Sequence, residues 1–238
     1  MSKQYAVLWC ANYKDGVPLK KQMIDALGVQ GDVWHILDPM DADFDKQAYG
    51  YDGYVISGSA RSVSEDKTSP LVARIMHFLG EIDRRSSAPV VGICFGAQAL
   101  AHAYGGQVGA NCSGRIRLGV ESLSWTEHAT RVVPKQDRSE VAIAQSHYES
   151  VLQLPADAQS LACSPTTENE IFLIRRRYLG IQGHPEVDNE TLSSVFLAFH
   201  RDDLDKESLQ TTVAEVTHPL QVTPVIQLIR RLLEEGTL

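Results

Sequence analysis

A chain of 238 residues is long enough for one sizeable domain, and it can bury a full core without disulfides or metals. Its formal net charge of -8 disfavours a general nucleic-acid binder, since phosphate backbones demand a basic face. Four scattered cysteines without Cys-x-x-Cys spacing argue against a zinc site and a disulfide framework. No apolar run approaches a membrane span or a signal peptide. We therefore expect a cytoplasmic protein that binds neither membrane nor nucleic acid.

The first half of the chain alternates short apolar runs with helical patterns, which indicates an α/β domain. The proline of Ser69-Pro70 suits the first position of a helix. The expected strands cover residues 5–10, 33–37, 53–57 and 90–94, and the expected helices cover residues 17–27, 71–82 and 97–104. We expect a three-layer fold with a mostly parallel central sheet, in which ligands bind beyond the carboxyl ends of the strands.

After residue 106 the pattern changes to short strands with no convincing long helix between them. This antiparallel region is expected to contain strands at residues 118–123, 131–133, 141–144, 160–162, 171–175 and 178–182. Arg175-Arg176-Arg177 is expected to form the hairpin turn between the last two strands. A helix over residues 189–200 and an amphipathic helix over residues 225–233 follow. We divide the chain into a main domain, residues 1–200, and a C-terminal helical extension, residues 201–238, packed on it.

Cys94 stands in the run Gly92-Ile93-Cys94-Phe95-Gly96, between an apolar strand and a helix. The run has the Gly-x-nucleophile-x-Gly form of a sharp strand-to-helix turn, in which small neighbours leave room for a strained nucleophile. The N-terminus of the following helix favours a thiolate, and the N–H of Phe95 points at the oxygen of a tetrahedral intermediate. A lone cysteine between apolar residues is more often a core residue, so the prediction depends on the flanking glycines.

His184 and Glu186 flank Pro185, directly after an apolar strand. Proline keeps His184 out of a helix, and side chains two positions apart in an extended segment lie on one side. Glu186 can therefore fix the tautomer of the imidazole and leave the other ring nitrogen for Cys94. A His-Pro pair alone would fit a surface turn, but its place after a strand favours function. The three residues supply a nucleophile, a base and an orienting acid for covalent acyl transfer.

The runs Gly-Ile-Cys-Phe-Gly-Ala-Gln at residues 92–98 and Gln-Gly-His-Pro-Glu at residues 182–186 closely resemble the class I glutamine amidotransferase family. Residues 51–59, 105–106 and 146–151 agree with the family in order and spacing. The resemblance implies a flavodoxin-like three-layer fold. It also implies a triad in which Cys94 is the nucleophile, His184 the general base and acid, and Glu186 the orienter.

The same resemblance implies the other residues of the site. The backbone N–H groups of Ser59 and Phe95 would bind the oxyanion. The glutamyl group of the substrate would contact Gly58, Gln98, His147 and Tyr148. His147 fits equally well as a hydrogen-bonded loop histidine. We expect no cofactor and no metal.

Two positions depart from the family pattern. The family's amidotransferases usually have Gly-Gly-Pro or Asn-Gly-Pro where this chain has Gly58-Ser59-Ala60, and Glu149 replaces a usual aspartate. The loop, the chain length and the C-terminal extension are similar to those of free-standing plant γ-glutamyl peptidases. Arg115 and Arg117 could pair with a substrate carboxylate, although such a pair more often solvates a loop. The other cysteines are expected to be packing residues: Cys10, Cys112 and Cys163.

The leading hypothesis is a cysteine hydrolase that cleaves a γ-glutamyl amide, in a small conjugate or in glutamine, through a thioester on Cys94. The alternative is a glutaminase subunit that delivers ammonia to a separate synthase, because the sequence contains no phosphate loop for an ATP-using step. A non-catalytic family member is a third hypothesis, and the intact triad argues against it. A synthase would be the partner under the alternative, and the apolar stripe of the last helix could serve a homodimer.

Overall fold

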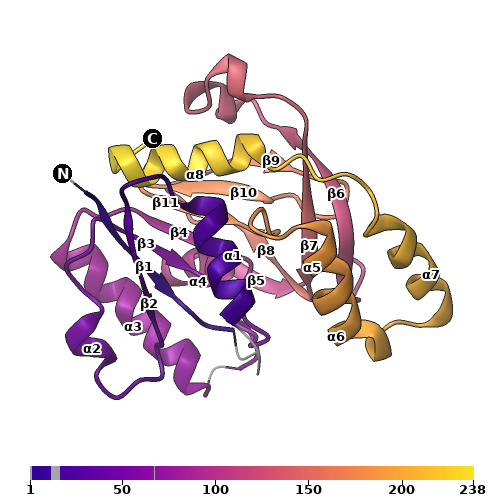
Figure 1. Ribbon diagram of the computed structural model, residues 1–238, viewed down its shortest axis with the longest axis horizontal. Coiled ribbons are helices and arrows are strands. Elements are labelled where there is room, and N and C mark those ends of the chain that lie inside the picture. Colours follow the sequence, from indigo (N-terminus) through magenta and orange to yellow (C-terminus); the bar gives the residue numbers. More distant parts are fainter. Residues whose placement is uncertain (1, 12–16, 67) are drawn as a thin grey trace.

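A nine-stranded sheet forms the centre of the computed structural model, which describes residues 2–11, 17–66 and 68–238 (Figure 1). The strand order is β2-β1-β3-β4-β11-β10-β9-β6-β7. The strands at one end of this order run parallel: β2 (Val33–Leu37), β1 (Gln4–Leu8), β3 (Gly53–Ile56), β4 (Val90–Ile93) and β11 (Tyr178–Ile181). This confirms the expected parallel sheet and places the carboxyl ends of its strands along one edge.

The rest of the large sheet is antiparallel and is built from the second half of the chain. Its strands are β10 (Ile171–Ile174), β9 (Ala158–Cys163), β6 (Arg117–Trp125) and β7 (Val141–His147). The turn from β10 to β11 forms the hairpin that the sequence predicted, with Arg175 and Arg176 in left-handed geometry at φ 49° and 62°. A separate two-stranded sheet pairs β5 (Gln107–Ala110) with β8 (Glu149–Gln153), which the sequence did not predict.

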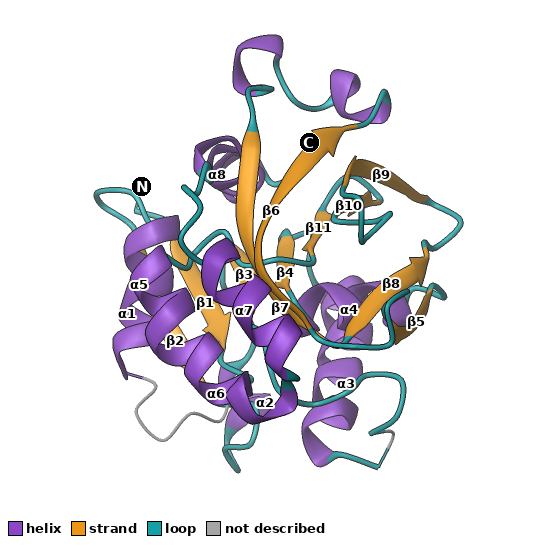
Figure 2. Cartoon of the chain, turned by 90° about the vertical axis from the view of Figure 1, so that its right-hand side faces the viewer, coloured by secondary structure: helices purple, strands orange, loops and turns teal. Residues whose placement is uncertain are grey.

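Helices cover both faces of the parallel strands and give the expected three layers (Figure 2). One face packs against α1 (Val17–Leu27) and α8 (Thr223–Glu235). The other face packs against α3 (Pro70–Arg85), α4 (Phe95–Ala103) and the short α2 (Phe44–Gln47). Central strands such as β4 are buried on both faces, which explains their unbroken apolar sequences.

A third apolar cluster lies between the antiparallel strands and the helical segment that follows β11. This segment consists of α5 (Asn189–Thr191), the π-helix η3 (Leu192–Leu197), α6 (Ala198–His200) and the 3-10 turn η4 (Arg201–Asp203). Leu192 and Phe196 pack there against Leu118 and Val120 of β6. The sequence predicted one regular helix over residues 189–200, whereas the structure contains six π-helical residues in its middle.

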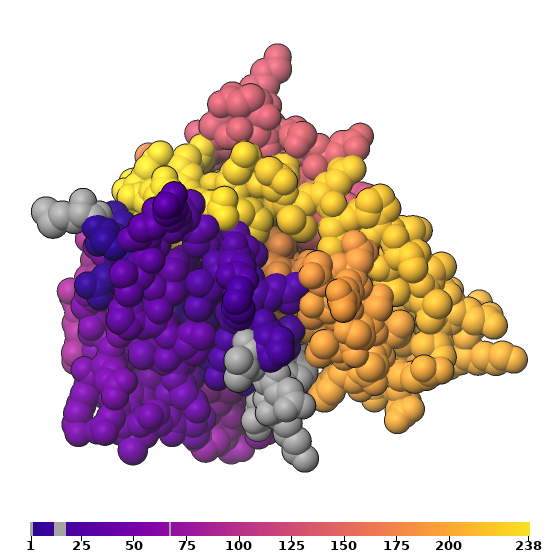
Figure 3. Space-filling view, viewed as in Figure 1, coloured from indigo at the N-terminus to yellow at the C-terminus, as the bar shows by residue number. Residues whose placement is uncertain are grey.

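The C-terminal residues form α7 (Lys206–Glu215) and α8. Figure 3 shows the yellow end of the chain along the upper rim, directly beside the indigo N-terminal part. Leu228, Ile229 and Leu232 of α8 are buried in the cluster shared with α1 and the sheet. The apolar stripe of α8 thus covers the chain's own core. The division of the chain at residue 200 stays a prediction.

Two predictions were wrong. Residues 131–133 are not a strand, because Val133 N–H bonds to the Ala129 carbonyl at 2.8 Å in the turn that follows η1 (His128–Arg131), with Val133 buried. A second short 3-10 turn, η2 (Lys135–Asp137), comes next. Cys112 is exposed rather than packed, whereas Cys10 is buried and Cys163 half-buried. In the described part of the chain, no helix is both long and apolar enough to cross a membrane.

Candidate active site

Cys94 occupies the corner between β4 and α4, at φ 52° and ψ −106°. A side chain with a Cβ avoids this backbone region, so the surrounding structure must hold the strained conformation. The flanking glycines allow it: a Cβ on Gly92 would lie 2.3 Å from the Gly96 carbonyl, and one on Gly96 would lie 2.3 Å from the carbonyl oxygen of Ile56. The expected strand-to-helix elbow is therefore present, with Cys94 at the carboxyl end of a central strand.

His184 lies next to Cys94 and is held in place by two hydrogen bonds. Its backbone N–H donates to the Ala144 carbonyl at 2.7 Å, and its Nδ1 lies 2.9 Å from Glu186 Oε1. Both side chains of this pair are buried. A ring edge of Phe196 also packs on the imidazole, with ring centroids 5.0 Å apart at 75°. Nδ1 is thus engaged by Glu186, which leaves Nε2 for the space around Cys94.

Gly58 brings the two residues to a common point. A Cβ on Gly58 would lie 3.0 Å from His184 Cε1, 3.6 Å from Cys94 Cβ and 3.8 Å from His184 Nε2. The loop after β3 therefore passes directly over the cysteine and the imidazole. A side chain at this position would press on the His184 imidazole, so the close approach favours glycine.

The charges of Glu186 and Cys94 act on the imidazole of His184. Burial lowers the pKa of His184, but the Glu186 carboxylate and the Cys94 sulfur outweigh it and raise this pKa to about 10. The ring is then an imidazolium at neutral pH, buried between two groups that accept its protons. The Cys94 sulfur thus lies beside a positively charged ring and at the N-terminus of α4.

Glu149 anchors the loop that carries Gly58 and Ser59. Its carboxylate accepts hydrogen bonds from Ser62 Oγ at 2.7 Å, from Val63 N–H at 3.0 Å and from Ser64 Oγ. Glutamate thus reaches from β8 across to the loop after β3. Where the family usually has an aspartate, this chain thus has a buried carboxylate that accepts three hydrogen bonds from one loop.

The Glu149 backbone carbonyl holds two further predicted site residues. Gln98 Nε2 donates to it at 2.8 Å, and His147 Nδ1 donates to it at 3.0 Å. Burial lowers the pKa of His147 to about 3, so its ring is neutral. Tyr148 differs from these two, because 46 % of its surface is exposed. Tyr148 is therefore open to a ligand, whereas Gln98 and His147 are already engaged by the backbone.

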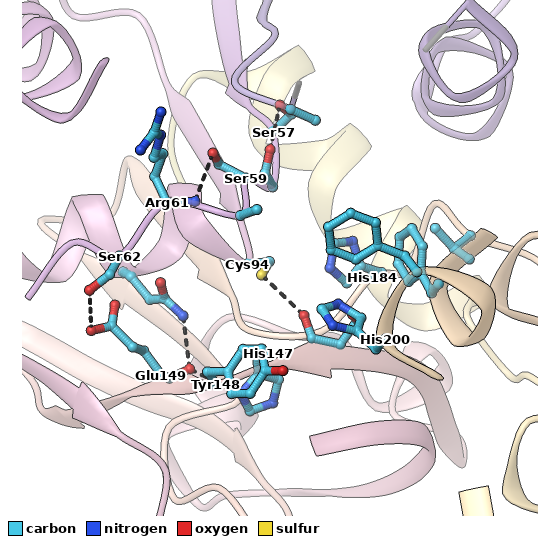
Figure 4. Close-up of a pocket in the computed structure, with 18 of the residues that line it drawn as sticks. Ser57, Ser59, Arg61, Ser62, Cys94, His147, Tyr148, Glu149, His184 and His200 are labelled. Atoms are coloured by element: carbon cyan, nitrogen blue, oxygen red, sulfur yellow. Dashed lines mark hydrogen bonds between the residues drawn. The ribbon is translucent and has the colours of Figure 1, made fainter. Parts of the chain in front are cut away.

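A cavity of about 510 Å³ opens around Cys94, and all the predicted site residues except Phe95 line it. Figure 4 shows Ser59, Ser62 and Glu149 on one side of Cys94, and His184 and His200 on the other. We call the first side the hydrogen-bonded wall and define it by these residues: Gly58, Ser59, Gln98, His147 and Glu149. We call the ring-lined part the aromatic wall and define it by these residues: Tyr148, Phe196, Phe199 and His200.

Three of these residues were not predicted from the sequence: Phe196, Phe199 and His200. Phe196 and Phe199 lie three positions apart in a segment expected to be helical, which is the signal that could have placed them on one face. Phe199 packs edge-on against His200 at 4.8 Å, and Tyr148 packs edge-on against the same ring at 5.7 Å. Asp203 also lines the cavity and lies 3.1 Å from His200 Nδ1.

Arg115 and Arg117 do not line the cavity and instead hold the C-terminal extension. Arg117 Nη1 pairs with Glu215 of α7 at 2.7 Å and Arg117 Nε with Glu121 at 2.9 Å. Arg115 pairs with Asp205, directly before α7, at 2.9 Å. These arginines attach α7 to β6 and its preceding loop, and the idea that they bind a substrate carboxylate has no support in the structure.

Comparisons with known proteins identify relatives of this chain. The family model for "Glutamine amidotransferase class-I" matches residues 17–201, more than half of the chain. "Gamma-glutamyl peptidase 4" of Arabidopsis thaliana is 31 % identical over 180 residues, which cover 72 % of this chain and 69 % of that protein. A "GMP synthase [glutamine-hydrolyzing]" of Ehrlichia ruminantium is 29 % identical over 143 residues, which cover 58 % of this chain and 26 % of that protein.

A solved structure shares the fold over the whole length of the chain. The glutamine amido transferase from Methylobacillus flagellatus superposes with a TM-score of 0.73 at 16 % identity, covering 100 % of this chain and 96 % of that one.

Proposed function

Because the chain belongs to the class I glutamine amidotransferase family, we propose that it is a hydrolase of γ-glutamyl amides that acts through a thioester on Cys94. The observation that carries the proposal is the convergence at Gly58, where Cys94 Cβ and His184 Nε2 both approach one point. The buried pair of His184 and Glu186 completes a triad of nucleophile, acid–base and orienter.

The triad accounts for both halves of the reaction. The Cys94 thiolate attacks the δ-carbonyl carbon of the γ-glutamyl group, and the His184 imidazolium gives its proton to the leaving nitrogen as the C–N bond breaks. The amine departs and a γ-glutamyl thioester remains. Neutral His184 then takes a proton from water, the hydroxide oxygen attacks the thioester, and the C–S bond breaks. Glutamate leaves, and the thiolate and imidazolium are restored.

The tetrahedral intermediates need donors for their negative oxygen. Phe95 is the first residue of α4, where a backbone N–H has no acceptor within the helix. Ser59 follows Gly58 in the loop above Cys94, and Glu149 anchors this loop three residues further on. We assign the backbone N–H groups of Phe95 and Ser59 to the oxyanion, where preorganised donors contribute most.

A conjugate as substrate is favoured by the size of the site. A cavity of about 510 Å³ lies in the range of sites for drug-sized ligands, about 300–1,000 Å³, and extends well beyond what a glutamyl group fills. The similarity to a γ-glutamyl peptidase points the same way. The alternative, a glutaminase subunit that supplies ammonia to a synthase, is favoured by the similarity to part of a GMP synthase.

The two candidate functions differ in whether the chain is active without a partner protein. A dedicated glutaminase subunit holds its site nearly silent until its synthase is loaded, whereas a peptidase keeps its oxyanion donors preorganised in isolation. The Glu149 anchor supports the second case, because it fixes the loop without a partner. We expect the purified chain to release glutamate steadily from γ-glutamyl conjugates, with glutamine the poorer substrate. A chain that is inert toward every conjugate, and that hydrolyses glutamine only when a co-purifying synthase is present, would contradict the proposal.

A further inference from the structure

The leaving group of the proposed reaction must lie beside His184. His184 gives its proton to the departing nitrogen, and a general acid works only within hydrogen-bond reach of the atom that it protonates. In the proposed reaction we place the glutamyl chain along the hydrogen-bonded wall, where Gln98 and Glu149 line the cavity. The substituent on the departing nitrogen therefore extends past His184, into the part of the cavity that the helical segment after β11 encloses.

That part of the cavity is lined by a chain of edge-to-face rings. Phe196 packs on His184, Phe199 packs on His200 at 88°, and Tyr148 packs on His200 at 70°. Among the Phe, Tyr and Trp side chains that the structure describes, Tyr148 and Phe199 are the two that are exposed, at 46 % and 55 %. Both line the cavity, so two accessible rings face one ligand space. A further ring on a ligand would extend this edge-to-face series.

Beyond the His184 imidazolium, the charges along the cavity disfavour a carboxylate on the leaving group. Among the described residues that line it, Arg61 is the one lysine or arginine, and it lies on the side of Ser59, away from His200 (Figure 4). Burial lowers the pKa of His200, more than its pairing with Asp203 raises it, so this ring is neutral at pH 7. Asp203 adds a negative charge at the same place, which repels an anionic group and tolerates a cationic one.

We propose that the aromatic wall is the leaving-group subsite and that it selects γ-glutamyl conjugates of aromatic amines that carry no carboxylate. This rests on the proposed function, because it is the protonation by His184 that places the leaving group there. The chemical class that fits is an arylalkylamine joined to the γ-carboxyl of glutamate. An amino acid or dipeptide leaving group places a carboxylate beside Asp203 and fits less well.

The test compares four substrates of the purified chain: γ-glutamylphenethylamide, its cyclohexylethyl analogue, γ-glutamylphenylalanine and glutamine. We expect kcat/KM to be highest for the phenethylamide, about two- to ten-fold above the cyclohexyl analogue, since an aromatic contact adds that much beyond area. Phenylalanine as leaving group differs only by its carboxylate, and we expect it to lose about ten-fold. Equal values for the phenethylamide and either matched compound would overturn the subsite.

Single substitutions in the aromatic wall test whether the preference for the phenethylamide arises there. Phe199→Ala and Tyr148→Ala should each lower the ratio of kcat/KM for the phenethylamide to that for glutamine by about two- to ten-fold. Leu152→Ala is the matched control, because Leu152 is 52 % exposed and does not line the cavity. A ratio unchanged in both aromatic variants, or changed equally in Leu152→Ala, would overturn the assignment.

Binding to the Cys94→Ala protein separates the subsite from the proposed chemistry. Calorimetry should give tighter binding of the phenethylamide than of γ-glutamylphenylalanine or glutamine, whatever the turnover of the intact enzyme. If the intact chain hydrolyses no γ-glutamyl compound yet its Cys94→Ala form prefers the phenethylamide, the hydrolase proposal fails and the subsite stands. If it hydrolyses all four compounds and binds them with equal affinity, the hydrolase proposal stands and the subsite fails.

Discussion

The two walls of the cavity are held in place by different forces. In the hydrogen-bonded wall, Gln98 and His147 both donate to the Glu149 carbonyl, and the Glu149 carboxylate accepts from three donors. The aromatic wall is joined by ring edges and by the hydrogen bond between His200 Nδ1 and Asp203 at 3.1 Å. Bond cleavage needs atoms fixed within fractions of an ångström, which directional bonds supply. A leaving group needs less exact placement than the reacting atoms, and rings in edge-to-face contact supply apolar area for it.

The largest effect should come from replacing Cys94, which lies between the two walls. Cys94→Ala removes the nucleophile, so we expect glutamate release to fall by about ten-thousand-fold or more. The melting temperature should stay close to that of the wild type, because alanine is small enough for the same turn. Cys163→Ala is the control and should keep full activity. A glutamine-like electrophile should label Cys94 alone, and mass spectrometry would contradict the assignment by finding the label on Cys10, Cys112 or Cys163.

The next effect should come from the acid that orients the imidazole. Glu186→Gln keeps the shape but removes the charge, and we expect kcat/KM to fall by about a hundred- to a thousand-fold. Since the Glu186 carboxylate helps to raise the pKa of His184 to about 10, its loss should lower this pKa. His184 then loses its proton at a lower pH, so the alkaline limb of the profile of kcat/KM against pH should move to lower pH. A limb that stays in place would show that His184 is not the group that titrates.

A smaller loss of activity should follow from adding a methyl group at Gly58, next to His184. Gly58→Ala places a methyl group 3.0 Å from His184 Cε1, so the imidazole must shift and kcat should fall by about ten- to a hundred-fold. Gly80→Ala is a matched control in α3, where the new methyl group meets nothing within 4 Å. It should stabilise the protein by about 0.5–1 kcal/mol and leave turnover unchanged. Equal activity in the two variants would mean that Gly58 does not approach His184 closely.

The smallest effect should come from weakening the hydrogen bonds that the Glu149 carboxylate accepts in the hydrogen-bonded wall. Glu149→Gln replaces an acceptor of three hydrogen bonds by an amide, which should cost about 2 kcal/mol of unfolding free energy and lower kcat by about ten-fold. The ratio between aromatic and matched aliphatic substrates should not change, because the aromatic wall is untouched. Glu168→Gln, an exposed carboxylate, is the control. A changed substrate ratio in Glu149→Gln would show that the two walls are not independent.

The sequence predicted the hydrogen-bonded wall far better than the aromatic one. The strand-to-helix turn at Cys94 follows from local sterics, since the flanking glycines and apolar strand specify it within a few residues. β5 and β8 were missed because each is short and pairs only with the other, more than thirty residues apart in sequence. The aromatic wall depends on how a helical segment rotates over the sheet, which local patterns do not encode. The turn at Val133 likewise reflects the tertiary burial of Val133, whose local apolar sequence alone favours a strand.

The π-helix η3 gives the aromatic wall a route to change that the hydrogen-bonded wall lacks. Each residue of an α-helix turns the chain by about 100°, so a deletion within Leu192–Leu197 that restored regular α-helix would rotate the next residues of the segment relative to those before it. Phe199 and His200 would then face another direction, whereas Cys94, His184 and Glu186 precede the deletion. The loss of a single codon in this segment would thus reshape the proposed leaving-group subsite without replacing a residue of the triad.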